Sequence, residues 1–255
     1  MLKKSGHGKE EPRLSNMLLN RAVDLPTEFD LRELKEIKIK DQGQLGSCGA
    51  TSLITLREFL LDDDVELSPS FLYYETRKRT GEENEDFGIS IREGIKTLLN
   101  TGVSEESYMP YNDKVYNIAP SEEAYKNAKK YKIKSYINLD QGIKGIMNWL
   151  YLKKTPVIFG MPVSEQFVQI NKAGIVHTPN KEDLNLGEHA CVILGWKQNN
   201  WKANLRAKIN KKYSKHGYFL CANSFGTQWG DNGYFWLSFE HILENIAYDF
   251  YVITV

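Results

Sequence analysis

The sequence predicts an α+β fold in which a helical first half is followed by a β-rich second half. Two observations support this prediction. Apolar residues recur at helical spacing in the first half, whereas short segments rich in apolar, β-branched and aromatic residues, bounded by Gly or Pro, fill the second half. With 255 residues, 41% hydrophobic and 26% charged, the chain can bury a full core as one large domain or as two lobes.

The first expected helix begins at or near Cys48. A Gly-rich turn over residues 41–49 leads into an apolar run over residues 53–60 that has helical spacing. Ahead of this turn, Ile37 and Ile39 alternate with lysines, which favours a short strand.

Two more helices are expected in the first half, over residues 68–79 and 90–100. Ser68 followed by Pro69 is a favourable helix start, and Gly102 is a favourable stop for the second of these helices.

The second half is expected to supply strands over residues 155–160, 187–196, 217–223 and 233–237. The Lys-rich stretch over residues 197–215 is expected to be an exposed hairpin or loop.

The charge balance and the lack of long apolar runs limit the expected partners and location. Lys plus Arg equals Asp plus Glu, 33 each, so neither a nucleic-acid nor a membrane partner is expected. No segment approaches the roughly 18 apolar residues of a membrane span, and residues 1–16 lack the apolar run of a secretory signal. We therefore expect a cytoplasmic or otherwise non-classical location, with a virion or host compartment as alternatives.

Cys48 is the candidate nucleophile. A thiol attacks as the thiolate, and a helix N-terminus and a nearby imidazolium both lower its pKa. A cysteine is more often a small buried hydrophobe, but a core residue would not need the Gly-rich turn that precedes Cys48. Gln42, six residues upstream, could place its amide beside the thiol as an oxyanion donor, together with the Cys48 N–H.

A histidine elsewhere in the chain must act as the base. His189 is the best candidate because it opens an apolar strand, although on the residues alone a structural histidine explains it equally well. His177 follows an apolar stretch and stays an alternative. His7 lies in the N-terminal tail, His216 in the Lys-rich stretch and His241 in an expected surface turn.

Asn223 is the candidate third member of the site. It begins a Gly- and aromatic-rich segment that ends at Tyr234, and by itself it reads as a turn residue. Its amide oxygen could accept from the imidazole N–H and so fix the orientation of the base.

These motifs together resemble the papain-like cysteine peptidases, which include the cathepsins, from about Leu25 to the C-terminus. The matching segments are Q-G-x-L-G-S-C-G-A around Cys48, G-E-H-A-C-V-I-L-G-W around His189 and N-S-F-G-T-Q-W-G-D-N-G-Y-F-W-L from Asn223, in the family's order. His189 lies at the usual separation from Cys48, ~130–150 residues, whereas Asn223 lies further on. The stretch over residues 197–215 is therefore expected to be an insertion.

The sequence also departs from the family pattern. Leu45 stands where the first Cys of the nucleophile motif is usual, Gly49 stands where an aromatic residue follows the nucleophile, and Phe225 replaces a tryptophan, while Trp229 is retained. The large pro-segment of animal and plant members is missing, so compact bacterial or viral-type members are the better match.

The resemblance implies a papain-like two-lobe fold. A helical N-terminal lobe would cover about residues 25–130, and a β-rich, barrel-like C-terminal lobe about residues 131–255, with the active site in the cleft between them. Residues 1–24 would be an N-terminal extension and a candidate short pro-segment. Because residues 17–19 are apolar and lie in an expected short helix over residues 15–21, we expect the extension to pack near the cleft, although a disordered tail also fits.

The resemblance further implies a cysteine-type endopeptidase that acts on peptides or proteins, needs no metal or cofactor, and is expected to be a monomer. Cys48 would form a thioester acyl-enzyme, with His189 as general base and acid and Asn223 orienting His189. Gln42 would complete the oxyanion hole. The expected substrate-binding residues are Gly88, Ile89 and Ser90.

Two other function classes stay open: a catalytically silent module that binds peptides, and a deconjugating or acyl-transfer enzyme with the same triad. Preferential labelling of Cys48 by a thiol reagent would exclude the first, and cleavage of general peptides to free acids would argue against the second. The acidic run over residues 82–86 is better explained as a solvated loop than as a rim that attracts basic substrates.

The remaining cysteines are expected to lie near the site. Cys191 is two residues after His189 and Cys221 is two residues before Asn223, and residues two apart in a strand face the same side. If His189 and Asn223 meet across antiparallel strands, the two thiols lie opposite or diagonal to each other, ~4.5–8 Å apart. We expect both to be reduced.

Overall fold

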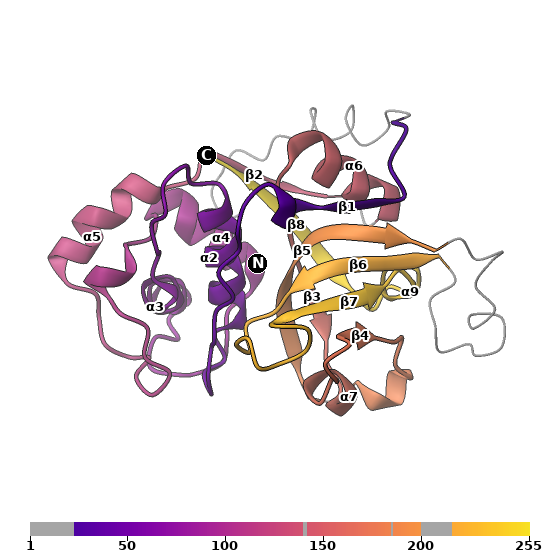
Figure 1. Ribbon diagram of the computed structural model, residues 1–255. Coiled ribbons are helices and arrows are strands. Elements are labelled where there is room, and N and C mark those ends of the chain that lie inside the picture. The colour runs from indigo at the N-terminus through magenta and orange to yellow at the C-terminus, as the bar shows by residue number, and fades with distance from the viewer. Residues whose placement is uncertain (1–22, 140–141, 185, 200–215) are drawn as a thin grey trace, which may run out of the picture.

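A computed structural model describes residues 23–139, 142–184, 186–199 and 216–255. The helices of the first half gather on one side, and the strands lie on the other (Figure 1). The predictions made for the extension, including the helix over residues 15–21, fall on residues 1–22 and lie outside the described residues. Within the described residues, no helix is both long and apolar enough to cross a membrane.

The three helices predicted in the first half are confirmed. They are α2 (Cys48–Phe59), α3 (Pro69–Thr80) and α4 (Ile91–Asn100). Ser68 caps α3 by accepting from the backbone N–H of Phe71. The short helix α5 (Glu122–Ala128) and the 3-10 turns η1 (Leu31–Glu33), η2 (Glu106–Tyr108) and η3 (Lys129–Tyr131) complete this part of the chain.

Helix α2 is the centre of the helical lobe because α3, α4 and β5 all pack against it. Gly94 of α4 permits close contact, since a Cβ at this position would lie 2.4 Å from Leu53 Cδ1 of α2. The core here includes the fully buried Leu53, Ile54 and Phe71. Burial of such side chains stabilises a fold by about 1.5–3 kcal/mol each.

The β-rich lobe is built on one mostly antiparallel sheet in the order β2-β8-β3-β5-β6-β7-β4, with β1 on β5 and with β4 parallel to β7. The four predicted strands are confirmed as β3 (Val157–Pro162), β5 (Glu188–Gln198), β6 (Gly217–Ala222) and β7 (Tyr234–Ser238). The other strands are β1 (Glu28–Asp30), β2 (Ser135–Asn138), β4 (Ile175–Val176) and β8 (Tyr248–Thr254).

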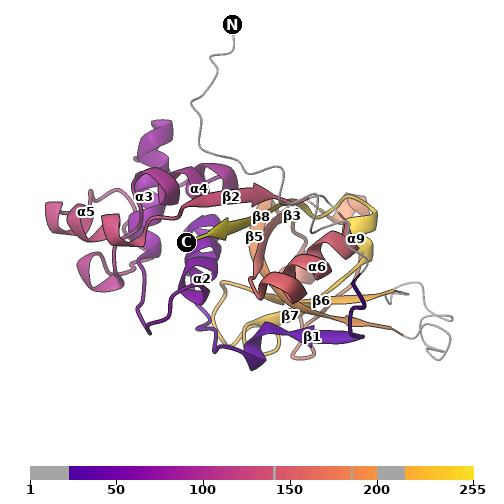
Figure 2. The same ribbon diagram turned by 90° about the horizontal axis from the view of Figure 1, so that it is seen from above.

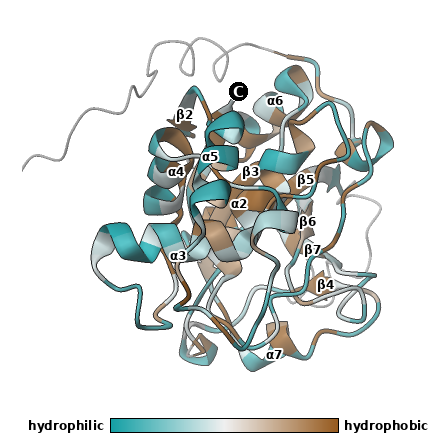
Figure 3. Cartoon of the chain, turned by 90° about the vertical axis from the view of Figure 1, so that its left-hand side faces the viewer, coloured by the Kyte–Doolittle hydropathy of each residue, from teal (hydrophilic) through white to brown (hydrophobic). Residues whose placement is uncertain are grey.

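The helix α6 (Ile143–Lys153) lies beside the sheet in the view from above (Figure 2). Its buried face joins a core that includes Trp149, Phe159 and Trp196. In Figure 3 the strands behind α2 are largely brown and α5 is largely teal, so the sheet is more apolar than this short helix of the helical lobe. The β-rich lobe also holds α7 (Glu165–Val168), η4 (Lys181–Asp183) and α9 (Glu240–Leu243).

One predicted strand is wrong. Ile37 and Ile39 lie in an irregular segment instead of a strand. Ile37 is buried in a small cluster with Val192 and Leu194, so the alternation reports contact with the surface of the sheet and not strand pairing. The strand of this region is β1, which can approach β5 because Gly195 has no Cβ to meet the carbonyl of Phe29.

The predicted arrangement of Cys191 and Cys221 is confirmed in its diagonal form. The register pairs Val192 with Ala222 and Ile193 with Cys221, which sets Cys191 opposite Asn223. Both thiols are free and buried. In the Lys-rich stretch, residues 197 and 198 continue β5, while residues 200–215 lie outside the described part of the chain.

Candidate active site

A cleft of about 680 Å³ runs between the two lobes and contains both Cys48 and His189. Gln42 lies in its wall. The structure therefore brings together side chains from a loop, a helix start and a strand that are far apart in the sequence. Other lining residues come from both lobes: Gly88, Ile89, Ser90, Val163, Glu188 and Phe225.

Cys48 is the first residue of α2, as predicted. The hydroxyl of Ser47 bonds to Tyr111 Oη at 2.6 Å and makes no side-chain cap on the helix. The N–H groups of the first turn therefore face the thiol without a competing cap, where they favour a negative charge.

The pKa of Cys48 lies below its usual value. Burial of the thiol raises the pKa, but the hydrogen bond and the positive charge of His189 outweigh that effect. The backbone N–H groups of Ala190 and Gly49 lower the pKa further. Cys48 is thus favoured as a thiolate next to a protonated imidazole.

His189 is the second residue of β5 and is only 6% exposed. Burial lowers its pKa, but hydrogen bonds with Cys191 and Cys48 and the negative charge of the Cys48 thiolate raise it well above its usual value. Because burial raises the pKa of Cys191, that thiol keeps its proton. The anion that stabilises the imidazolium is therefore the thiolate of Cys48.

Asn223 follows β6 directly and is 5% exposed. Its Oδ1 lies 2.7 Å from His189 Nε2 and 2.8 Å from the backbone N–H of Ser224. A backbone N–H can only donate, so the atom that faces it is the amide oxygen. His189 therefore donates through Nε2–H, which leaves Nδ1 for Cys48.

Several hydrogen bonds fix Gln42. Its Nε2 donates to Leu45 O at 2.7 Å, its Oε1 accepts from Ser224 Oγ at 2.5 Å, and its backbone N–H donates to Ser224 O at 2.8 Å. The second hydrogen on Nε2 remains to meet a group in the cleft. The sequence did not indicate the role of Ser224, whose only signal is that it follows Asn223.

Aromatic side chains pack against the imidazole ring of His189. The ring centroids of Phe225 and Phe167 lie 4.8 Å and 5.6 Å from that of the imidazole. Trp229 packs on Phe225 with centroids 5.6 Å apart. Phe225, which replaces a tryptophan, therefore still shields the site from water.

The other departures from the family pattern have local explanations. At Gly49 a Cβ would lie 3.0 Å from the side chain and the carbonyl of Ile89, so Ile89 fills the space beside the nucleophile. Leu45, at the position of the usual first Cys, is 6% exposed and thus packs as an ordinary buried residue.

The predicted substrate-binding residues Gly88, Ile89 and Ser90 all line the cleft. Gly88 has φ +81°, which glycine adopts without strain. Its N–H already donates to Tyr73 Oη at 3.2 Å. The Ser90 hydroxyl accepts from the N–H of Glu93 and caps α4.

Hydrogen bonds from Gly46, Tyr73 and Arg77 anchor the acidic run over residues 82–86. Asp86 accepts from the N–H of Gly46 at 3.1 Å and from the hydroxyl of Tyr73. The fully buried Arg77 donates to the carbonyls of Glu83 and Glu85 at 2.9 Å and 2.6 Å. The run is a solvated loop as predicted, since Glu82, Asn84 and Glu85 are exposed. Its backbone is anchored by Arg77, and Asp86 holds the turn before Cys48. Such common residue types gave no sequence signal for this.

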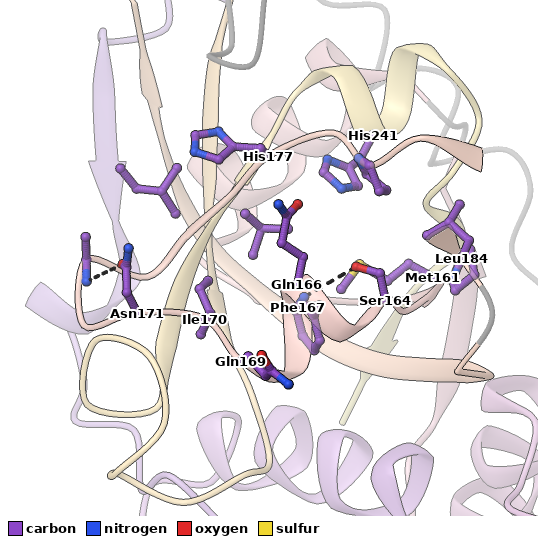
Figure 4. A pocket seen from close by; sticks show the side chains of 15 residues that line it. Met161, Ser164, Gln166, Phe167, Gln169, Ile170, Asn171, His177, Leu184 and His241 are labelled. Carbon is purple, nitrogen blue, oxygen red and sulfur yellow. Dashed lines mark hydrogen bonds between the residues drawn. The ribbon is translucent and has the colours of Figure 1, made fainter. Parts of the chain in front are cut away.

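The structure does not bring the alternative base His177 to Cys48. Figure 4 shows His177 in a second cavity, of about 340 Å³, together with His241 and Gln166. His241 is 2% exposed and not in a surface turn as predicted, because α9 packs inward and Ser238 Oγ lies 2.8 Å from His241 Nδ1. Burial lowers the pKa of His241 to about 4.

Comparisons with known proteins agree on one family. A family model described as papain family cysteine protease matches residues 25–250. An uncharacterized peptidase C1-like protein of Acanthamoeba polyphaga mimivirus is 31% identical over 88% of this chain and 73% of its own length. A cysteine protease of Blomia tropicalis is 25% identical over 88% of this chain, which spans 64% of that relative's length.

Solved structures give the same result. Xylellain, a cysteine protease from Xylella fastidiosa, matches with a TM-score of 0.78 and 29% identity over 97% of this chain and 90% of that chain. A cysteine protease of Carica candamarcensis, solved in complex with E-64, matches with a TM-score of 0.65 over 90% of this chain and 99% of that chain. At 18% identity this second likeness is one of fold alone.

Proposed function

Because the chain belongs to the papain family of cysteine proteases, we propose that it hydrolyses internal peptide bonds through an acyl-enzyme on Cys48. The observation that carries the proposal is the buried line from Asn223 through His189 to Cys48, which ends in the cleft between the lobes. Papain-like proteases act on peptides or proteins, and the substrate here is proposed to be the same.

The first half of the proposed reaction forms the acyl-enzyme. The Cys48 thiolate attacks the scissile carbonyl carbon, and the carbonyl oxygen gains the negative charge. The Cys48 N–H and the second Nε2 hydrogen of Gln42 stabilise that oxyanion. His189 then gives its Nδ1 proton to the leaving amine as the C–N bond breaks, which leaves a thioester.

The second half regenerates the thiolate. Neutral His189 takes a proton from water through Nδ1 while the water oxygen attacks the thioester carbon. The C–S bond breaks, the acid product leaves, and the imidazolium again faces the thiolate. Asn223 keeps the ring in place through both halves because its oxygen holds Nε2–H.

An internal cut site is supported by the shape of the cleft. Residues of both lobes line it, and Gly88, Ile89 and Ser90 form its wall on the helical side. An extended peptide could lie along this wall and continue past Cys48. We assign the three residues to substrate binding on this ground.

Two measurements test the proposal. The first is cleavage of a peptide library, with mass spectrometry of the products; internal cuts that yield free acids are expected. The second is labelling with E-64, which should modify Cys48 and leave the buried Cys191 and Cys221 unmodified. Labelling without cleavage would indicate a peptide-binding module, and transfer of the acyl group to an added amine without free acid would indicate an acyl-transfer enzyme.

A further inference from the structure

Cys191 is a buried thiol that the proposed mechanism does not use, although it touches the site. It is fully buried on β5, opposite Asn223, and its Sγ lies 3.7 Å from Asn223 Oδ1. At this distance a thiol can donate a weak hydrogen bond to the oxygen. Because burial raises its pKa, Cys191 keeps the proton that it would donate.

The other end of the Asn223 amide makes this contact important. Asn223 Nδ2 is buried and has no hydrogen-bond partner among the described residues. All the hydrogen bonds recorded for the amide are therefore on Oδ1, from His189, Ser224 and Cys191. Nothing at Nδ2 holds the amide in its present orientation, so the donors at Oδ1 must do so.

A flip of the amide would disable the site. Nδ2–H would then face His189 Nε2 and require that nitrogen to be an acceptor. The neutral imidazole would carry its hydrogen on Nδ1, where it could no longer take a proton from water beside Cys48. The imidazolium would lose the acceptor that stabilises Nε2–H.

We propose that Cys191 is a positioning residue: its thiol, together with the Ser224 N–H, holds the Asn223 oxygen toward His189. This inference rests on the proposed roles of Cys48, His189 and Asn223. Ser224 donates through its backbone and cannot be tested by substitution of its side chain. Cys191 is thus the donor that mutation can remove.

Cys221 is a matched control on the neighbouring strand. It is also fully buried, and its Sγ donates to the carbonyl of Phe219 at 3.8 Å, not to Asn223. Cys191→Val and Cys221→Val make the same chemical change at the same depth of the same core. Cys191→Ala is a second variant without a donor that adds no bulk, and Cys191→Ser restores the donor.

The readout is the rate at which iodoacetamide alkylates Cys48, measured from pH 4 to pH 10, with kcat/KM for a cleaved peptide alongside. In Cys191→Val and Cys191→Ala, kcat/KM should fall about two- to three-fold, at the low end for one lost hydrogen bond because a thiol is a weak donor. The decrease in kcat/KM should come from a lower kcat, with KM unchanged. The pH range in which alkylation is fast should narrow from both sides, because a less stabilised imidazolium lowers the pKa of His189 and raises that of Cys48.

Cys191→Ser should keep the wild-type pH range of fast alkylation. Cys221→Val should keep it too, even if the melting temperature of that variant falls. An unchanged pH range in both Cys191 variants without a donor would overturn the inference, as would an equal shift in Cys221→Val. Cys191 also contacts His189 directly, so further narrowing on adding Cys191→Val to Asn223→Ala would overturn it as well. Alkylation does not depend on peptide cleavage. A wild-type chain whose Cys48 shows no fast alkylation at neutral pH would instead refute the proposed function.

Discussion

The two lobes hold their parts of the site in different ways. On the helical side, the turn before Cys48 is an irregular loop held by separate bonds. Some come from side chains, as from Gln42 to Leu45 and from Ser47 to Tyr111, and some from the backbone, as from the Gln42 N–H to Ser224 O. On the β-rich side, backbone pairing between strands fixes the position of the site residues. His189 is paired with Met161 of β3.

This difference has a consequence for mutation. A loop held by separate side chains can lose one contact and shift by a fraction of an ångström while the rest of the fold stays intact. A strand in a sheet moves only if its backbone ladder moves. We therefore expect substitutions around Cys48 to change activity without unfolding, whereas the orientation of His189 depends on the few side chains at Asn223.

The largest effect on activity is expected when the reacting side chain of either lobe is removed. Cys48→Ala and His189→Ala should each lower kcat/KM by about 10³-fold or more, with little change in the thermal unfolding curve. His177→Ala is the control because His177 lines the second cavity, and it should retain wild-type kcat/KM. Activity that survived in His189→Ala and vanished in His177→Ala would show that the base is misassigned.

Gln42→Ala should have the next largest effect. Loss of one oxyanion donor costs about 10²-fold in kcat, with little change in KM. Ser224→Ala removes only the 2.5 Å bond to Gln42 Oε1 and leaves the donor in place, so a fall of a few-fold is expected. If both variants lost activity equally, Gln42 would act through the shape of the turn and not as a donor. Steady-state kinetics on one peptide decides this.

Asn223→Ala should lower kcat/KM by less than His189→Ala does, because Asn223 orients the ring and does not react. The rate of hydrolysis needs Cys48 deprotonated and His189 protonated. It therefore falls below the lowered pKa of Cys48 and above the raised pKa of His189. Without Asn223 both values should return toward normal, so the bell-shaped profile of kcat/KM against pH should narrow. If the acidic and basic sides of this profile stayed at the same pH, the orienting role of Asn223 would be contradicted.

The smallest effect is expected at the hydrogen bonds that link Tyr73 to Asp86 and Gly88 at the wall of the cleft. Tyr73→Phe keeps the ring that Arg77 stacks on but removes the hydroxyl shared by Asp86 and Gly88. KM should rise about two- to three-fold. Neither kcat nor the profile of kcat against pH should change. Tyr125→Phe, which removes a hydroxyl of α5 that donates to Glu75 of α3, should leave KM as it is, because neither residue lines the cleft.

Sequence reasoning succeeded where the signal was local. The start of α2 at Cys48, the cap at Ser68 and the apolar strands bounded by Gly or Pro follow from signals within a few residues. Cys48, His189 and Gln42 were singled out because each stands in a short motif, and the fold brings all three to one cleft. Their catalytic roles stay predictions until the variants above are measured.

The sequence could not supply features that depend on register or burial. Ile37 alternates like a strand residue yet only packs on a sheet. The contact of Cys191 with Asn223 requires knowing that the two lie directly opposite each other, and the brace at Asp86 joins residues of three separate segments. Such pairings are set by the whole fold, so no window along the chain contains them.

The place of β8 in the sheet has a consequence for the order of folding. This strand, residues 248–254, comes last along the chain yet lies between β2 and β3, next to the strand that pairs with His189. The sheet therefore cannot close until these residues have left the ribosome. Strand β8 also supplies Tyr251 and Ile253 to the core of the helical lobe. Contacts this distant in sequence form slowly, so we expect a nascent chain to carry an incomplete and inactive cleft. Synthesis itself would delay the appearance of a working protease.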